Sequence, residues 1–205
     1  MKDPAGICSA DAMERPLFEP LSAEHERPDE WSGPLGFVIG GFACPPMQAE
    51  RDGALAEQYF NAAIALIDDI LARRVADFHV ANAALFLFRH SIELLLKAGL
   101  PPEARQKKNI HHLGDLAKSY AHHKKSTGET VPAWVIKRCE ELAAIDPGST
   151  AFRYGGYGFP RAKDGSAIMD EIHVDLEHLK VAMLALNVAL VEQNWLIRMA
   201  RGERP

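Results

Sequence analysis

Residues 83–97 read AALFLFRHSIELLLK, and a single cation, Arg89, interrupts this most apolar stretch of the chain. The stretch predicts a helix over about residues 75–98, which Gly99 and the two prolines after it would end. A buried arginine needs a partner because an unpaired buried charge is costly. Glu93 lies one helical turn further on. Two interpretations follow: an internal Arg89–Glu93 ion pair, or an arginine that receives a phosphate while Glu93 orients it.

Further helices are expected on both sides of this one. Apolar residues recur at three- and four-residue spacing from about Met47, which predicts a preceding helix. Shorter helices are expected over about 110–123 and 132–145. Asp175 is a suitable N-cap for a long final helix over about 176–201. The chain is therefore expected to be all-α, a bundle of four to five helices.

The final helix carries two apolar seams, whereas one is enough for a helix on the outside of a bundle. Two seams predict either a central helix or the interface of a homodimer. The second seam consists of Val181, Leu184, Val188, Val191 and Trp195.

Two regions lack helical periodicity. Residues 1–48 hold seven of the thirteen prolines and predict an irregular N-terminal arm, which leaves 49–205 as a single helical domain. Asp146 opens a Pro-Gly turn, and the glycine-rich residues 155–160 cannot hold a helix. Residues 168–174 alternate weakly and predict a short strand that pairs back to 151–154. A small β-like insertion is thus expected around 151–174.

Composition sets broad bounds. The net charge of −5 argues against a general nucleic-acid coat, and hydrophobic and charged fractions of 47% and 25% are those of a soluble globular protein. Residues 103–125 nevertheless hold six Lys or Arg against two acidic residues, so they form either a local phosphate-binding patch or a solvated helix face. Three cysteines without a CxxC motif, no signal peptide and no membrane span predict a reduced, cytoplasmic setting and no membrane association.

Three segments in a fixed order resemble the HEPN superfamily of small α-helical bundles. They are residues 88–97 (FRHSIELLLK), His112-Leu113 before a short helix, and Asp146 followed by Phe152-Arg153-Tyr154. The resemblance covers about residues 50–200. It implies a bundle that dimerises and needs no cofactor. Many members are metal-independent ribonucleases of toxin–antitoxin, abortive-infection or CRISPR systems, and others are inactive RNA- or nucleotide-binding modules, so RNA, a nucleotide or an antitoxin protein are the implied partners.

The catalytic signature of that superfamily is an arginine followed, after four to six residues, by a histidine near the start of a late helix. The spacing occurs here at Arg73/His79, Arg74/His79 and Arg105/His111, all outside the final helix. That helix opens with Asp175-Leu176-Glu177-His178 and has no arginine at this distance.

The resemblance suggests roles for five residues. Arg89 and Arg153 would receive phosphate, Glu93 would orient Arg89, and Tyr154 would stack or hydrogen-bond. His112 would be the acid–base group, with Arg153 as the cation that stabilises the phosphorane. Each role has a structural alternative: an ion pair on the bundle for Arg153, and capping or orientation within the bundle for His112.

No metal site is expected. Di-iron bundles use Glu-x-x-His pairs, which this chain lacks. The alternative to RNA or nucleotide binding is a non-catalytic scaffold or protein-interaction module. In that case Arg89, Glu93 and Arg153 only lock the bundle, and its surface serves a partner protein.

Overall fold

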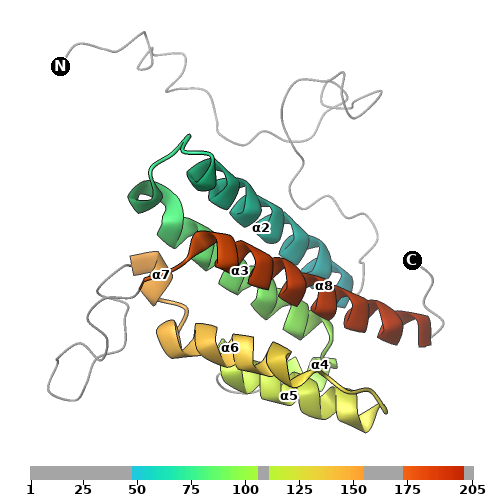
Figure 1. The fold of residues 1–205 in the computed structure, drawn as a ribbon. Helices are drawn as coiled ribbons and strands as arrows, with labels where there is room; N and C mark the ends of the chain where they lie inside the picture. Colours follow the sequence, from blue (N-terminus) through green and yellow to red (C-terminus); the bar gives the residue numbers. More distant parts are fainter. Residues whose placement is uncertain (1–47, 106–110, 155–172, 201–205) are drawn as a thin grey trace, which may run out of the picture. The chain divides into compact units, whose positions relative to one another are not determined.

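The computed structural model describes residues 48–105, 111–154 and 173–200, and their regular structure is entirely helical (Figure 1). Two of the helices are single turns, α4 (Pro102–Arg105) and α7 (Ala151–Tyr154). The long helices are α2 (Gln48–Leu71), α3 (Asp77–Ala98), α5 (Leu113–Ser126), α6 (Ala133–Ile145) and α8 (Leu176–Ala200). The predicted all-α class is confirmed for these residues.

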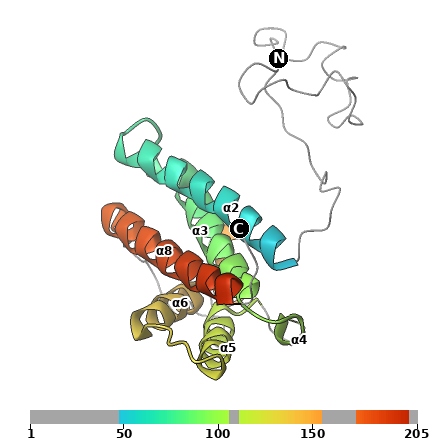
Figure 2. The ribbon, with the colours of Figure 1, turned by 90° about the vertical axis from the view of Figure 1, so that its right-hand side faces the viewer.

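Helix α3 is the centre of the bundle. It contacts α2, α5, α7 and α8, and α8 also contacts α2 and α6. Figures 1 and 2 show α2 on one side of α3, the α5–α6 pair on the other, and α8 running alongside. The second half of α3 is buried almost continuously because helices surround it; its buried residues include Phe88, Ile92 and Leu96. Residues 83–97, the most apolar stretch of the chain, therefore lie at the centre of the core.

Helix boundaries follow local chemistry. The Asp175 side chain accepts the backbone N–H of His178 at 3.0 Å, which confirms Asp175 as the N-cap of α8. At the end of α3, the Gly99 N–H donates to the carbonyl of Leu95. None of the helices in the described ranges is both long and apolar enough to cross a membrane.

The predicted β-like insertion is wrong where the structure describes it. Residues 151–154 form the helical turn α7 because Asp146 Oδ1 accepts the backbone N–H groups of Thr150 at 2.6 Å and Ala151 at 2.9 Å. These bonds satisfy donors that a helix start leaves free. The remainder of the insertion, 155–172, lies outside the described residues, as does the predicted arm up to residue 47.

Helix α8 is joined to α3 and α5 by hydrogen bonds between the buried Tyr120 and the half-buried Asn194. The Tyr120 hydroxyl donates to Asn194 Oδ1 at 2.9 Å, and Asn194 Nδ2 donates to the carbonyl of Leu95 at 2.8 Å. Burial raises the pKa of Tyr120, so the hydroxyl stays protonated and can donate. Gly99 lies against both Tyr120 and Asn194, and a Cβ there would clash with the two side chains.

We expect Gly99→Ala to lower the free energy of unfolding by about 1–3 kcal/mol, because an added methyl overpacks this junction. Gly53→Ala is the matched control: a Cβ at Gly53 in α2 meets nothing within 4 Å. That change should stabilise the protein by about 0.5–1 kcal/mol through helix propensity. Urea unfolding followed by circular dichroism measures both. Equal effects of the two variants would contradict the close packing at Gly99.

Candidate functional site

Arg89 is fully buried, with an exposed fraction of 0%, and each of its guanidinium nitrogens has an acceptor. Nη1 donates to Glu93 Oε2 at 2.9 Å, and Nη2 donates to the carbonyl of His111 at 2.6 Å. Nε donates to the carbonyl of Asp146 at 3.2 Å and lies 3.3 Å from Asp146 Oδ2. This geometry is that of the internal ion pair, extended by Asp146. It directs no donor of Arg89 outward to a phosphate.

Glu93 connects this buried centre to the surface. Its Oε1 accepts from Lys97 Nζ at 2.6 Å and lies 2.8 Å from His111 Nδ1. Burial alone would raise the pKa of Glu93, but the hydrogen bonds and charges of Lys97, His111 and Arg89 outweigh it and hold the pKa below its ordinary value. Glu93 is therefore a carboxylate at neutral pH. The His111 side chain is 68% exposed, so the contacts from Arg89 through Glu93 to His111 lead from the core to solvent.

His112 caps helix α5. Its Nδ1 accepts the backbone N–H of Asp115 at 3.2 Å and lies 3.2 Å from the Asp115 carboxylate. Two roles for His112 were open from the sequence, an acid–base group and a helix cap. Its contacts in the structure are those of a helix cap. Its neighbour His111, which the sequence singled out only through the Arg105/His111 spacing, binds Arg89 through its carbonyl and contacts Glu93 through its exposed ring.

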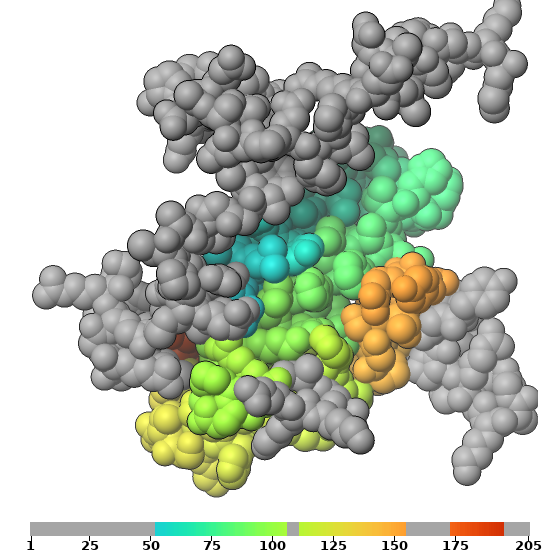
Figure 3. Space-filling model, turned by 180° about the vertical axis from the view of Figure 1, so that it is seen from behind, coloured from blue at the N-terminus to red at the C-terminus, as the bar shows by residue number. Residues whose placement is uncertain are grey.

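Arg153 and Tyr154 are exposed on α7. Arg153 Nε donates to the carbonyl of Ser149, and the guanidinium carbon lies 5.6 Å from the Phe86 ring centre and 5.5 Å from that of Tyr154. Within the described ranges, no carboxylate is in ion-pair range of Arg153. Figure 3, seen from behind, shows α7 in orange standing beside the green surface of α3. The structure thus separates exposed Arg153 from buried Arg89.

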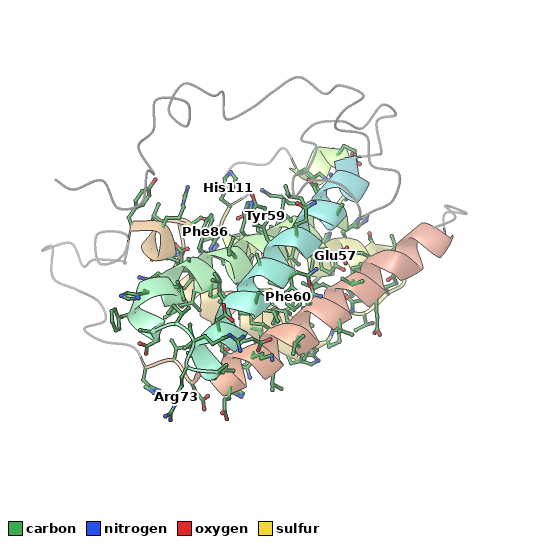
Figure 4. The ribbon with its side chains drawn as sticks, turned by 90° about the horizontal axis from the view of Figure 1, so that it is seen from above. Glu57, Tyr59, Phe60, Arg73, Phe86 and His111 are labelled. Carbon is green, nitrogen blue, oxygen red and sulfur yellow. The ribbon has the colours of Figure 1, made fainter. Side chains whose placement is uncertain are left out.

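Aromatic rings continue from α7 across α3 to α2. The ring of His90 stacks on Phe86 with centres 5.7 Å apart and planes at 6°, and Tyr59 meets His90 edge-on at 4.7 Å. Figure 4 labels Tyr59, Phe86 and His111 on the same side of α2 and α3. We call this set the stacking row; it consists of Tyr59, His90, Phe86, Arg153 and Tyr154.

The stacking row joins two residues that were predicted from the sequence, Arg153 and Tyr154, to three that were not, Tyr59, Phe86 and His90. The one signal available was that Phe86 and His90 are four residues apart and so share a helix face. Burial lowers the pKa of His90; Lys97 and Arg89 add to this effect and Glu93 opposes it. The His90 ring is therefore uncharged at neutral pH and contributes a flat π surface.

Two kinds of chemistry find no support in the described residues. No group of three or more His, Cys, Asp or Glu side chains there is placed to hold a metal ion. Cys139 is buried in α6, and burial raises the pKa of its thiol to about 12, so it is not a thiolate nucleophile at neutral pH.

We expect Arg89→Met to destabilise the protein by about 3–5 kcal/mol, because it leaves Asp146 as a buried carboxylate without its cation. Arg138→Met is the control, since Arg138 pairs with Glu141 at 2.5 Å on the surface of α6. That variant should change stability by less than about 1 kcal/mol. Denaturant unfolding of both variants gives the comparison. A small effect at Arg89 would contradict its structural role.

Comparisons of the chain with protein-family models, curated proteins and solved structures gave no match. The resemblance to the HEPN superfamily therefore rests on the three sequence segments. The first and third segments meet in space, because Arg89 donates a hydrogen bond to the carbonyl of Asp146. Arg89 also donates to the carbonyl of His111, the residue just before the second segment.

Proposed function

We propose that this chain is a HEPN-type helical bundle that binds single-stranded RNA or a nucleotide through the stacking row. The observation that carries the proposal is the continuous series of ring and guanidinium contacts from Tyr59 to Tyr154. Every base has a π face, so aromatic rings and arginine planes bind single strands with little regard to sequence.

Charge on this surface supports a phosphate-bearing ligand. Arg153 is exposed and has no carboxylate in ion-pair range among the described residues. It can therefore pair with a phosphate while it lies against Phe86. Tyr154 is 62% exposed, which leaves room for a base on its ring. Arg89 and Glu93 act here as the support of the surface rather than as its ligands.

A metal-independent ribonuclease is the narrower form of this proposal. RNA cleavage without metal needs a histidine that takes a proton from the 2′-hydroxyl and a cation for the phosphorane. With its proton on Nδ1, His111 would donate to Glu93 and leave Nε2 free as a base. Arg153 would supply the cation. A cytoplasmic toxin–antitoxin or defence role, with an antitoxin as partner, belongs to this form and comes from the resemblance.

The second candidate is a non-catalytic scaffold or protein-interaction module. The ion pairs of Arg89 with Glu93 and Asp146 favour this candidate, because they give Arg89 a structural role in place of a ligand-binding one. This candidate requires no RNA affinity.

A homodimer through α8 accompanies either candidate. Val181, Leu184, Val188 and Val191 are exposed by 65%, 39%, 51% and 45%, and they recur at the alternating three- and four-residue spacing of a helix–helix seam. An identical helix offers the matching seam across a two-fold axis.

RNA binding can be tested with a labelled single-stranded RNA in EDTA, by fluorescence anisotropy over a salt series. We expect Tyr154→Ala to weaken the affinity about five- to hundredfold, as the loss of about 1–3 kcal/mol of base stacking requires. Arg153→Gln should lower the salt dependence, with the slope of log K against log salt falling by about 0.7.

The matched control is Arg73→Gln, because Figure 4 places Arg73 away from His111 and Phe86. It should change neither affinity nor slope. Absence of RNA binding by the parent would favour the scaffold. The same samples on a denaturing gel report cleavage: a ribonuclease should lose cleavage but keep binding in His111→Ala, and intact RNA with the parent protein would leave a binding module.

The dimer predicts that Val188→Glu gives a monomer in sedimentation velocity, since it places a charge in the seam of both copies. Ala144→Glu makes the same kind of change on the exposed side of α6 and should leave the dimer intact. A parent protein that is already monomeric at micromolar concentration would rule this interface out.

A further inference from the structure

A cavity of about 350 Å³ lies between α3, α6, α7 and the start of α8, separate from the stacking row. Its size falls within the range of roughly 300–1,000 Å³ that small-molecule sites occupy. Figure 1 shows α7, the end of α6 and the start of α8 gathered at the same end of the bundle.

The cavity walls are mainly apolar. Phe152 and Met183 are buried side chains of this wall. Other apolar side chains from α3, α6 and α8 complete it, namely Leu85, Leu142, Ile145 and Leu179. Such walls favour a ligand with an aliphatic or aromatic body, because its transfer from water is driven by apolar contact.

Polar groups at the cavity favour one type of ligand end. Arg138 is already paired with Glu141 at 2.5 Å, so its charge is balanced. Asp175 supplies a second carboxylate, and its Oδ1 caps the N-terminus of α8. Two carboxylates against one guanidinium disfavour an anion. His173, His178 and Asn82 add groups that can accept or donate a hydrogen bond.

We propose that this cavity binds a small, mainly apolar molecule that carries a hydrogen-bond donor, such as an amine. The molecule would place its apolar body against Phe152 and Met183 and its donor toward Asp175 and Glu141. Helix α7 gives the site a second consequence, because Phe152 lies in the cavity wall while Arg153 and Tyr154 of the same turn belong to the stacking row. A molecule in the cavity would then change the affinity of the stacking row for RNA. This coupling rests on the proposed function, whereas binding of the small molecule to the cavity does not.

The site can be tested by titrating the full chain with N-phenyl-1-naphthylamine, a neutral apolar fluorophore with one N–H donor. The parent should bind it saturably with one site per chain. Ala182 lines the cavity, so Ala182→Leu fills it and should weaken binding about tenfold or more. Ala185→Leu makes the identical change at an exposed position of α8 and should bind as the parent does. Circular dichroism melts verify that both variants are folded.

Equal binding by parent and Ala182→Leu, equal loss in both variants, or no saturation in the parent would overturn the site. Displacement of the fluorophore tests the ligand class: octylamine should displace it at a lower concentration than octanoate. The reverse order would overturn the donor-bearing ligand.

RNA affinity with and without octylamine tests the coupling to the stacking row. A change in the parent that Ala182→Leu lacks would support this coupling. An unchanged RNA affinity would overturn the coupling alone, and fluorophore binding can be read whether or not the protein binds RNA.

Discussion

The rest of the structure depends on the burial of one guanidinium. A fully desolvated arginine is tolerated only when several acceptors surround it, and no single helix can supply them. Arg89 obtains them from α3 itself, from the segment before α5 and from the turn before α7. Three separate parts of the chain are therefore fixed to one another at the middle of the central helix.

This constraint also determines what lies on the surface. Asp146 uses one carboxylate oxygen for the Arg89 ion pair and the other for the backbone at the start of α7. Through the Asp146 side chain, the buried Arg89 thus positions the turn α7, which carries the exposed Arg153 and Tyr154. Glu93 does the same for His111. Arg89 is thus buried, whereas the groups that it positions indirectly through Asp146 and Glu93 are exposed.

Much of the fold could be predicted from the sequence. Apolar spacing indicated α2, α3 and α8, Gly99 and its prolines marked the end of α3, and Asp175 marked the start of α8, because these signals are local. The spacing of Arg89 and Glu93 indicated their pairing for the same reason. Helix α7 could not be predicted, since four residues are too few to show a period and their cap lies five residues earlier at Asp146.

The site was predicted less well because it depends on which helix faces meet. Phe86 and His90 are indistinguishable in sequence from core residues of α3, and only the position of α7 shows that Phe86 lies under Arg153. His111 and His112 are adjacent, and their roles differ because one faces Glu93 while the other caps α5. The periodicity of apolar residues shows which side chains share a face of a helix, but tertiary contacts decide which face is covered.

The separation along the chain of the groups that hold Arg89 has a consequence for folding. Glu93 is four residues from Arg89, but the carbonyls of His111 and Asp146 are 22 and 57 residues away. A hairpin of α2 and α3 could form early from local contacts, yet it would carry a half-satisfied cation in its apolar side. Its middle can therefore desolvate only when the later segments dock. Arg89 thus couples parts of the chain that are up to 57 residues apart, and a bundle without the later segments would leave this cation short of acceptors.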